Sequence, residues 1–426
     1  MATDYRQMWT DLGLDLEAHD ALLQALGQGY QDIFLAQKGR PAGMGYFDFV
    51  MSEVHGLRVK ELLDAKAEGR PVVGSFCVFV PEELVLAVGG VAVGLCAGAE
   101  FAFDKVEQHI PRNTCALIKA FLGFGLARVC PYLTAADLLV GENTCDGKKK
   151  AWEIADGLIA PIHVMDLPQV KSAEGRGLLT AEYRRFMAKM EELSGKQITL
   201  ESLEDAIGVV NRKRAALARL ARLRSANPAP ISGLDALLVN QVSFYDDPVR
   251  FTASVNALCD EVEARVAAGK GVFPADTPRI LVSGCPMAVP NWKVPWVIET
   301  SGGVIVGEES CVGERGLRDQ VATDVADLDG LLGAIVDRYF AIDCAIFTPN
   351  PDRLGHVREL RDRTGADGVL HYGLQFCTPY QMEAGPVEKA VKGDGTPFLR
   401  LETDYSMEDV EQLRTRVGAF VELLGG

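Results

Sequence analysis

The chain of 426 residues is longer than one hydrophobic core usually serves, so we expect two or three domains. Hydrophobic residues make up 48% and charged residues 24%, which excludes a disordered chain. The formal charge of −16 argues against nucleic acid or an anionic membrane as a partner, because both require clustered positive charge.

Residues 1–20 have no basic region followed by an apolar core, so we expect no secretory signal. The longest uncharged stretch, 84–99, is shorter than the roughly 20 residues of a membrane span. We therefore expect a cytoplasmic protein, in which the ten cysteines would stay reduced. The absence of C-x-x-C argues against a zinc ribbon or a thioredoxin-type pair, so metal binding would use cysteines from distant positions.

In chain order, residues 1–66 form an expected helical segment that ends with an amphipathic helix at 51–66. A first α/β domain is expected at 67–175. Its strands are predicted at 71–80 (which contains Cys77), 91–96, 138–141 and 162–165, with helices opening at Pro81, at 116–124 and from Lys148.

A block of long amphipathic helices is expected at 176–275. Ser202 and Asp205 have the spacing of a capping box for the longest helix. Residues 212–224 form a basic run with helical spacing, and we expect a solvated helix face there rather than a docking site.

The second α/β domain is expected at 276–426. Strands are predicted at 279–283, 303–307, 341–347, 369–372 and 398–402, and helices near 292–299, 328–339, 352–364, 380–391 and 407–424. Regular alternation of this kind predicts a doubly wound parallel sheet.

Several cysteines follow these predicted strands. Cys145 lies in the loop between a strand and a helix, Cys285, Cys311 and Cys377 follow other strands, and Cys344 lies inside the one at 341–347. Ligands of open α/β sheets bind at the carboxyl edge of the strands. A single cysteine is most often a core residue, but this repeated placement suggests a shared inorganic centre bound by thiolates.

Cys115 precedes the helix at 116–124, whose amides lower a thiol pKa and favour the metal-binding thiolate. Cys130 has no such setting, and a core role is equally expected. The six histidines are scattered, which disfavours a histidine zinc site. Only His371 is a candidate site residue, with a core histidine as the alternative. Thiolates without paired histidines favour iron–sulfur, copper(I) or zinc centres.

Common nucleotide and hydrolase motifs are missing. Residues 141–148 resemble a phosphate loop but have the wrong glycine spacing, and no G-x-G-x-x-G follows a strand. No G-x-S-x-G or H-E-x-x-H occurs either.

Five segments carry a family resemblance, namely 76–83 (FCVFVPEE), 111–115 (PRNTC), 142–150 (ENTCDGKKK), 283–286 (SGCP) and 309–313 (ESCVG). Together they resemble the 2-hydroxyacyl-CoA dehydratase D-component family and, within it, the branch of double-cubane cluster proteins. The likeness runs from about residue 45 to the C-terminus, and the CDGKKK block is its most specific part.

The resemblance implies two flavodoxin-like α/β domains, an N-terminal helical segment, and a helical block between the domains. It implies one [4Fe-4S] cluster held by Cys115, Cys145 and Cys377, as in the dehydratases. In the double-cubane branch a second cubane completes an [8Fe-9S] centre, for which Cys285, Cys311 and Cys344 are the further ligands. Whether Cys77 or Cys96 replaces one of these six stays open.

The implied function is a low-potential, anaerobic reductase of small molecules. Its electrons would come from a separate ATP-hydrolysing iron–sulfur activator, and a homodimer is expected. A [4Fe-4S] dehydratase or acyl-CoA reductase subunit is the first alternative, and a non-catalytic electron carrier is the second. His371 and Glu142 are the candidate catalytic residues, and Lys148, Lys149 and Lys150 form either a solvated face or a charge that offsets the cluster.

Overall fold

The structure is a computed structural model that describes residues 4–95 and 97–426. It contains two four-stranded sheets in which every strand pairing is parallel. The first sheet has the order β2-β1-β3-β4 and consists of β1 (Val72–Ser75), β2 (Val91–Gly94), β3 (Leu138–Glu142) and β4 (Ile162–Met165). The second has the order β6-β5-β7-β8 and consists of β5 (Arg279–Gly284), β6 (Val304–Glu309), β7 (Gly368–Leu374) and β8 (Phe398–Thr403). Both orders are the doubly wound, flavodoxin-like order, so the predicted fold class is confirmed.

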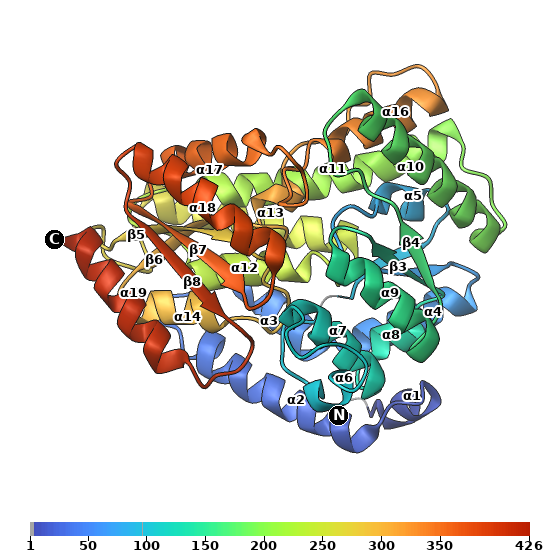
Figure 1. The fold of residues 1–426 in the computed structure, drawn as a ribbon, viewed down its shortest axis with the longest axis horizontal. Coiled ribbons are helices and arrows are strands. Elements are labelled where there is room, and N and C mark those ends of the chain that lie inside the picture. The colour runs from blue at the N-terminus through green and yellow to red at the C-terminus, as the bar shows by residue number, and fades with distance from the viewer. Residues whose placement is uncertain (1–3, 96) are drawn as a thin grey trace.

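The helices that precede and surround the first sheet are α1 (Arg6–Asp11), α2 (Leu16–Tyr30), the π-helical turn η1 (Gln31–Leu35), α3 (Met44–Ser52), α4 (Leu57–Ala67), α5 (Glu82–Ala87), α6 (Phe103–Val106), α7 (Ala116–Leu126), α8 (Pro131–Ala135) and α9 (Asp146–Leu158). The first helices do not form a separate layer. Tyr30 and Phe34 pack edge-on against Trp292 of the second half, and Figure 1 shows α2 running along the lower edge of the molecule.

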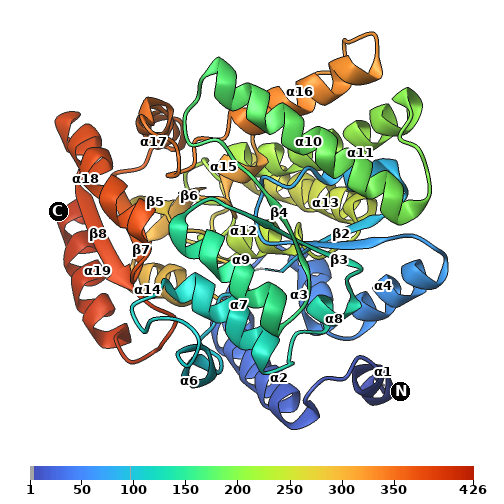
Figure 2. The same ribbon diagram turned by 45° about the vertical axis from the view of Figure 1, so that its right-hand side comes forward.

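Four long helices follow β4: α10 (Ala173–Ser194), α11 (Leu200–Leu223), α12 (Gly233–Val242) and α13 (Pro248–Ala267). The helices of the last part of the chain are α14 (Lys293–Thr300), α15 (Glu314–Leu317), α16 (Leu328–Phe340), α17 (Pro351–Thr364), α18 (Thr378–Gly393) and α19 (Val410–Gly425). Helix α11 packs on α5, α13, α15 and α16 and so links the two sheets, which lie on opposite sides of the molecule in Figures 1 and 2. None of the helices in the described ranges is both long and apolar enough to cross a bilayer.

Two predicted strands differ from the structure. The strand expected at 71–80 ends at Ser75, and the turn that follows carries Cys77 beyond the strand. The segment 341–347 is a loop, although Ile342 and Phe347 are buried in the core. In sequence, an apolar run in a buried loop has the same residue pattern as a buried strand. The two are distinguished only by whether the segment forms backbone hydrogen bonds with a neighbouring strand. Residue 96, at the end of the strand expected at 91–96, lies outside the described residues.

Two predictions about α11 are also wrong. Its capping box pairs Thr199 with Ser202, so the helix begins before the predicted Ser202–Asp205 box. The basic run at 212–224 is not simply a solvated face, because three of its cations are buried. Lys213 pairs with Glu82, Arg214 with Glu83 at 2.7 Å, and Arg224 with Glu308. These ion pairs join α11 to both α/β halves.

Candidate functional site

Seven cysteines line one cavity of about 1010 Å³ at the carboxyl edges of the two sheets. They are Cys77, Cys115, Cys145, Cys285, Cys311, Cys344 and Cys377. The structure therefore brings together all six cysteines predicted as ligands, and Cys77 with them. Histidine is absent among the described residues that line this cavity.

The two sheets place their cysteines at matching points. β3 and β7 hold the same position in their sheets, and each is followed by a cysteine that is the N-cap residue of the next helix: Cys145 before α9 and Cys377 before α18. β1 and β5 also correspond, and Cys77 and Cys285 come shortly after them. The repeated strand order thus delivers thiols from both halves of the chain to one place.

Cys115 and Cys344 come from the segments that connect the second and third strands of each sheet in chain order. Cys311 follows β6. Cys115 is the N-cap residue of α7, as its position before a predicted helix indicated.

The local sequence around Cys145 fixes the position of its sulfur. Gly141 is required in β3, because a Cβ there would lie 2.6 Å from the Trp152 ring. Trp152 in turn donates from Nε1 to the Glu142 carbonyl at 2.9 Å, which holds α9 against the strand. The Cys145 sulfur accepts the amide of Lys148 at 3.4 Å in the first turn of the helix.

The thiols interact with one another. A hydrogen bond with Cys377 and burial raise the pKa of Cys115 well above its ordinary value, although the amides of Leu117 and Ile118 lower it. The predicted low pKa of Cys115 is therefore wrong for the protein without a bound cation, because the neighbouring thiol raises this pKa by more than the helix amides lower it. The hydrogen bond with Cys115 lowers the pKa of Cys377, but a hydrogen bond with Cys285 and burial raise that pKa well above its ordinary value.

Burial raises the pKa of Cys145 above its ordinary value and that of Cys344 to about 11. Burial, and then Glu142, raise the pKa of Cys77, to which Cys311 and Cys344 contribute as well. Several of these thiols can become thiolates together only if positive charge compensates them.

Cys77 differs from the other six cysteines in the charge that lies beside it. Each of the six has a hydrogen bond at its sulfur from an amide or a side chain. Cys77 lies near the Glu142 carboxyl group, whose negative charge adds to the effect of burial and raises the thiol pKa.

A buried salt-bridge network lies behind Cys311 and Cys344. Glu309 accepts hydrogen bonds from Arg315 and from Ser283, both at 2.6 Å, and forms an ion pair with Arg353 at 3.1 Å. All three charged side chains are fully buried.

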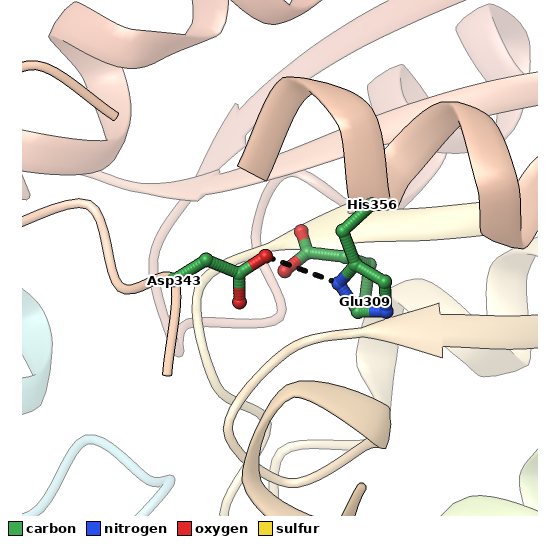
Figure 3. Close-up of side chains that lie close together, drawn as sticks. All are labelled: Glu309, Asp343 and His356. Atoms are coloured by element: carbon green, nitrogen blue, oxygen red, sulfur yellow. Dashed lines mark ion pairs between the residues drawn. The ribbon is translucent and has the colours of Figure 1, made fainter. Parts of the chain in front are cut away.

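Glu309, Asp343 and His356 bring three possible metal-ligand atoms within 4.8 Å of one another (Figure 3). His356 Nδ1 lies 3.2 Å from Asp343, whose other oxygen lies 3.4 Å from Arg318. Since guanidinium groups already face both carboxylates, this group is a salt-bridge cluster that disfavours a further cation.

Glu142 and His371, the predicted catalytic residues, do not line the cavity. Glu142 is fully buried and paired with Lys148. His371 lies inside β7, with Nε2 3.2 Å from the Tyr380 carbonyl and its ring stacked on Phe398. Burial lowers its pKa to about 3, so it is neutral at ordinary pH. A catalytic role for either residue stays a prediction.

The remaining candidates lie elsewhere. Cys130 is the N-cap residue of α8 and packs in the core, where burial raises its pKa to about 11. Lys149 and Lys150 are exposed and form ion pairs along the surface of α9, whereas Lys148 is buried. The three lysines are therefore not one solvated face.

A family model described as 2-hydroxyglutaryl-CoA dehydratase, D-component, matches residues 77–424. The chain belongs to this family. The relatives of this chain include YjiM of Escherichia coli strain K12, whose name describes a putative dehydratase subunit. It is 39% identical over 368 residues, which cover 85% of this chain and 94% of YjiM.

More distant D-component relatives have names that specify substrates. The (R)-phenyllactyl-CoA dehydratase beta subunit of Clostridium sporogenes is 26% identical and covers 84% of this chain and 92% of its own. A benzoyl-CoA reductase subunit of Thauera aromatica is 21% identical and covers 83% and 90%. The family therefore comprises dehydratase and reductase subunits, and the predicted resemblance to the D-component family is confirmed.

Sequence reasoning missed Arg315 and Tyr380, which contact the sulfurs of Cys311 and Cys344. Arg315 comes four residues after Cys311, a spacing that one helical turn brings together, and this was an available signal. Tyr380 had none, because its hydroxyl meets Cys344 only across the fold.

Proposed function

We propose that the thiol cavity holds an [8Fe-9S] double-cubane cluster and that the protein is a reductase of small molecules. Cys115, Cys145 and Cys377 would hold one cubane, and Cys285, Cys311 and Cys344 the other. When bound, such a cluster supplies low-potential electrons. The observation that carries the proposal is the convergence of six hydrogen-bonded sulfurs on one cavity, twice the three expected for a single cubane.

The donor set fits an iron–sulfur group. Seven cysteines but only two acidic residues, Asp146 and Glu383, are among the described residues that line the cavity, and soft thiolates select iron–sulfur clusters over oxygen-bound metals. Burial and the neighbouring thiols raise the thiol pKa values, so several thiolates would need a bound cation to be stable together.

Cys77 is not in the proposed ligand set. Burial and then the negative charge of Glu142 raise its pKa, which disfavours the thiolate that a cluster ligand requires. Cys285 accepts the Leu374 amide at 3.4 Å, the pattern expected of a ligand. This difference favours Cys285 over Cys77 in the choice that the sequence left open.

The chain's own residues would bind and enclose the group. Amides at the first turns of α7 and α9 and in the loop after β7 hold the sulfurs in place. Electrons would come from a separate ATP-hydrolysing activator, which agrees with the lack of a phosphate loop in this sequence. Reduction of acetylene, for example, would take two electrons from the activator and two protons from solvent to give ethylene. A homodimer in the cytoplasm, with domains at 67–175 and 276–426, is part of the same proposal.

The test is a count of iron and acid-labile sulfide after anaerobic purification, with about eight irons and nine sulfides expected per chain. Cys285→Ser should lower the iron count, whereas Cys77→Ser should leave it unchanged. The reverse result would move Cys77 into the ligand set. Zinc without iron would contradict every iron–sulfur assignment.

A [4Fe-4S] dehydratase or acyl-CoA reductase subunit is the second candidate, because the relatives are named as dehydratase and reductase subunits. It requires three ligands and a dissimilar partner subunit. About four irons per chain, with Cys285 and Cys311 dispensable, would select it.

A further inference from the structure

The six proposed ligand sulfurs receive two kinds of hydrogen-bond donor. Cys145 and Cys285 each accept a backbone amide at 3.4 Å. Cys115 and Cys377 also accept backbone amides. Cys311 and Cys344 differ, because the polar side chains of Arg315 and Tyr380 reach their sulfurs, in addition to the Ile346 amide at Cys344.

The donor at Cys311 is a buried cation. Arg315 Nη1 lies 3.6 Å from the Cys311 sulfur, and the side chain is fully buried. Arg315 also donates to the Glu309 carboxylate at 2.6 Å and to the Gly284 carbonyl at 3.2 Å. These bonds fix the guanidinium, so its position beside the sulfur does not depend on a mobile side chain.

The donor at Cys344 is the hydroxyl of Tyr380, 3.8 Å from the sulfur. This hydroxyl accepts a hydrogen bond from Arg315. Because a guanidinium only donates, the hydrogen of the phenol remains available for Cys344. Two guanidinium groups lie near the Tyr380 ring, with Arg315 at 5.2 Å and Arg353 at 4.9 Å from its centroid. Cation–π contacts of this kind hold the ring in place.

Hydrogen bonds to cluster sulfurs, net charge and burial set the reduction potential of iron–sulfur groups. A positive charge at a dry site acts more strongly than one in water. We propose that Arg315 and Tyr380 are positioning residues that raise the reduction potential at the Cys311 and Cys344 end of the cavity. An electron that enters the double cubane would then rest at this end rather than at the Cys115 and Cys145 end. This inference rests on the proposed function.

The experiment compares the parent protein with Tyr380→Phe. The variant keeps the ring near the two guanidinium groups and removes only the hydroxyl. Tyr132→Phe is the matched control, since its buried hydroxyl donates to the Val54 carbonyl instead of a sulfur. Iron and sulfide are counted first, and each anaerobic protein is then titrated with dithionite under potential control and followed by electron paramagnetic resonance.

We expect Tyr380→Phe to keep the iron and sulfide of the parent and to lower the more positive midpoint potential. A tenfold change in the reduction equilibrium corresponds to about 59 mV for one electron, and the shift should lie at or below this value. The less positive midpoint potential, and both midpoints of Tyr132→Phe, should match the parent.

Three results would overturn the inference, and they are distinguishable. Identical midpoints in Tyr380→Phe and the parent, with full iron, would leave the proposed function standing and remove the role of Tyr380. Loss of iron in Tyr380→Phe would mean that the hydroxyl is needed to retain the cluster and does not act by setting its reduction potential. About four irons in the parent would contradict the proposed function itself, and the inference with it.

Discussion

In each sheet, one strand ends at a buried glutamate that forms an ion pair with a basic residue six positions later in the sequence. Glu142 at the end of β3 pairs with Lys148, and Glu309 at the end of β6 pairs with Arg315. The two carboxyl groups nevertheless behave differently. Burial raises the pKa of Glu142, and Lys148 does not offset it. Burial also raises the pKa of Glu309, but Arg315 and Arg353 together bring it below its ordinary value. One lysine therefore leaves the pKa of a fully buried carboxyl group above its ordinary value, whereas two arginines bring the pKa below that value.

The largest expected effect concerns the matching cysteines of the two sheets. Cys145→Ser and Cys377→Ser should each lose most of the bound iron, because both sulfurs begin the helix after corresponding strands and serine is a poor ligand for iron–sulfur clusters. Cys130→Ser is the control, since Cys130 lies outside the cavity. Visible absorbance and iron content are measured after identical anaerobic reconstitution. Equal iron in all three variants would contradict the ligand assignment.

The second effect separates the two buried carboxylates directly. Arg353→Met removes a cation from Glu309 and Glu383, and should lower the free energy of unfolding by about 3–5 kcal/mol. Lys148→Met should cost only about 1–2 kcal/mol, because Glu142, with its raised pKa, can take up a proton instead of remaining a lone buried charge. Urea unfolding at pH 7 measures both losses. Similar losses would show that the number of cations does not decide the cost.

The third effect compares a histidine in each sheet. Burial lowers the pKa of His371 in β7 to about 3, whereas an unfolded histidine has a pKa near 6.5. In this pH range His371 binds a proton in the unfolded chain but not in the folded protein, so stability falls as the pH drops through 6.5 towards 3. Between pH 7.5 and 5.0 this amounts to about 2 kcal/mol.

His371→Gln should therefore lose about 2 kcal/mol less than the parent between these two pH values, measured by urea unfolding. His163 in β4, whose pKa burial lowers to about 4, is partly exposed, so His163→Gln should show a smaller change. An unchanged pH dependence in His371→Gln would mean that His371 is protonated in the folded protein.

The smallest effect concerns the lysines that follow Lys148. Replacing Lys149 and Lys150 together with Gln should change the free energy of unfolding by only a few tenths of a kcal/mol, because both are exposed and their ion pairs are solvated. The comparison with Lys148→Met in the same urea assay is the control. A loss as large as that of Lys148→Met would mean that the exposed ion pairs also contribute substantially to the free energy of unfolding.

The sequence by itself determined the elements whose signals are local. The alternation of apolar runs and amphipathic segments located the eight strands of the described residues along with one at 341–347 that is a loop, and the predicted strand at 162–165 has the bounds of β4. The turn residues before Lys148 placed Cys145 at a helix N-terminus for the same reason, because strand ends and helix caps depend on neighbours within a few residues. The motif match that indicated the family is also a property of consecutive residues.

Only the tertiary structure decided which groups face one another. The loop at 341–347 has the apolar pattern of a strand, but it pairs with neither of the two sheets of the described residues, so Cys344 enters the cavity from a loop. The group that lies beside a sulfur comes from far away in the chain, such as Glu142 at Cys77 and Tyr380 at Cys344. Packing across the fold also decided which of two adjacent lysines is buried. Lys148 and Lys149 have the same side chain, yet only Lys148 is removed from water and paired with a buried carboxyl group.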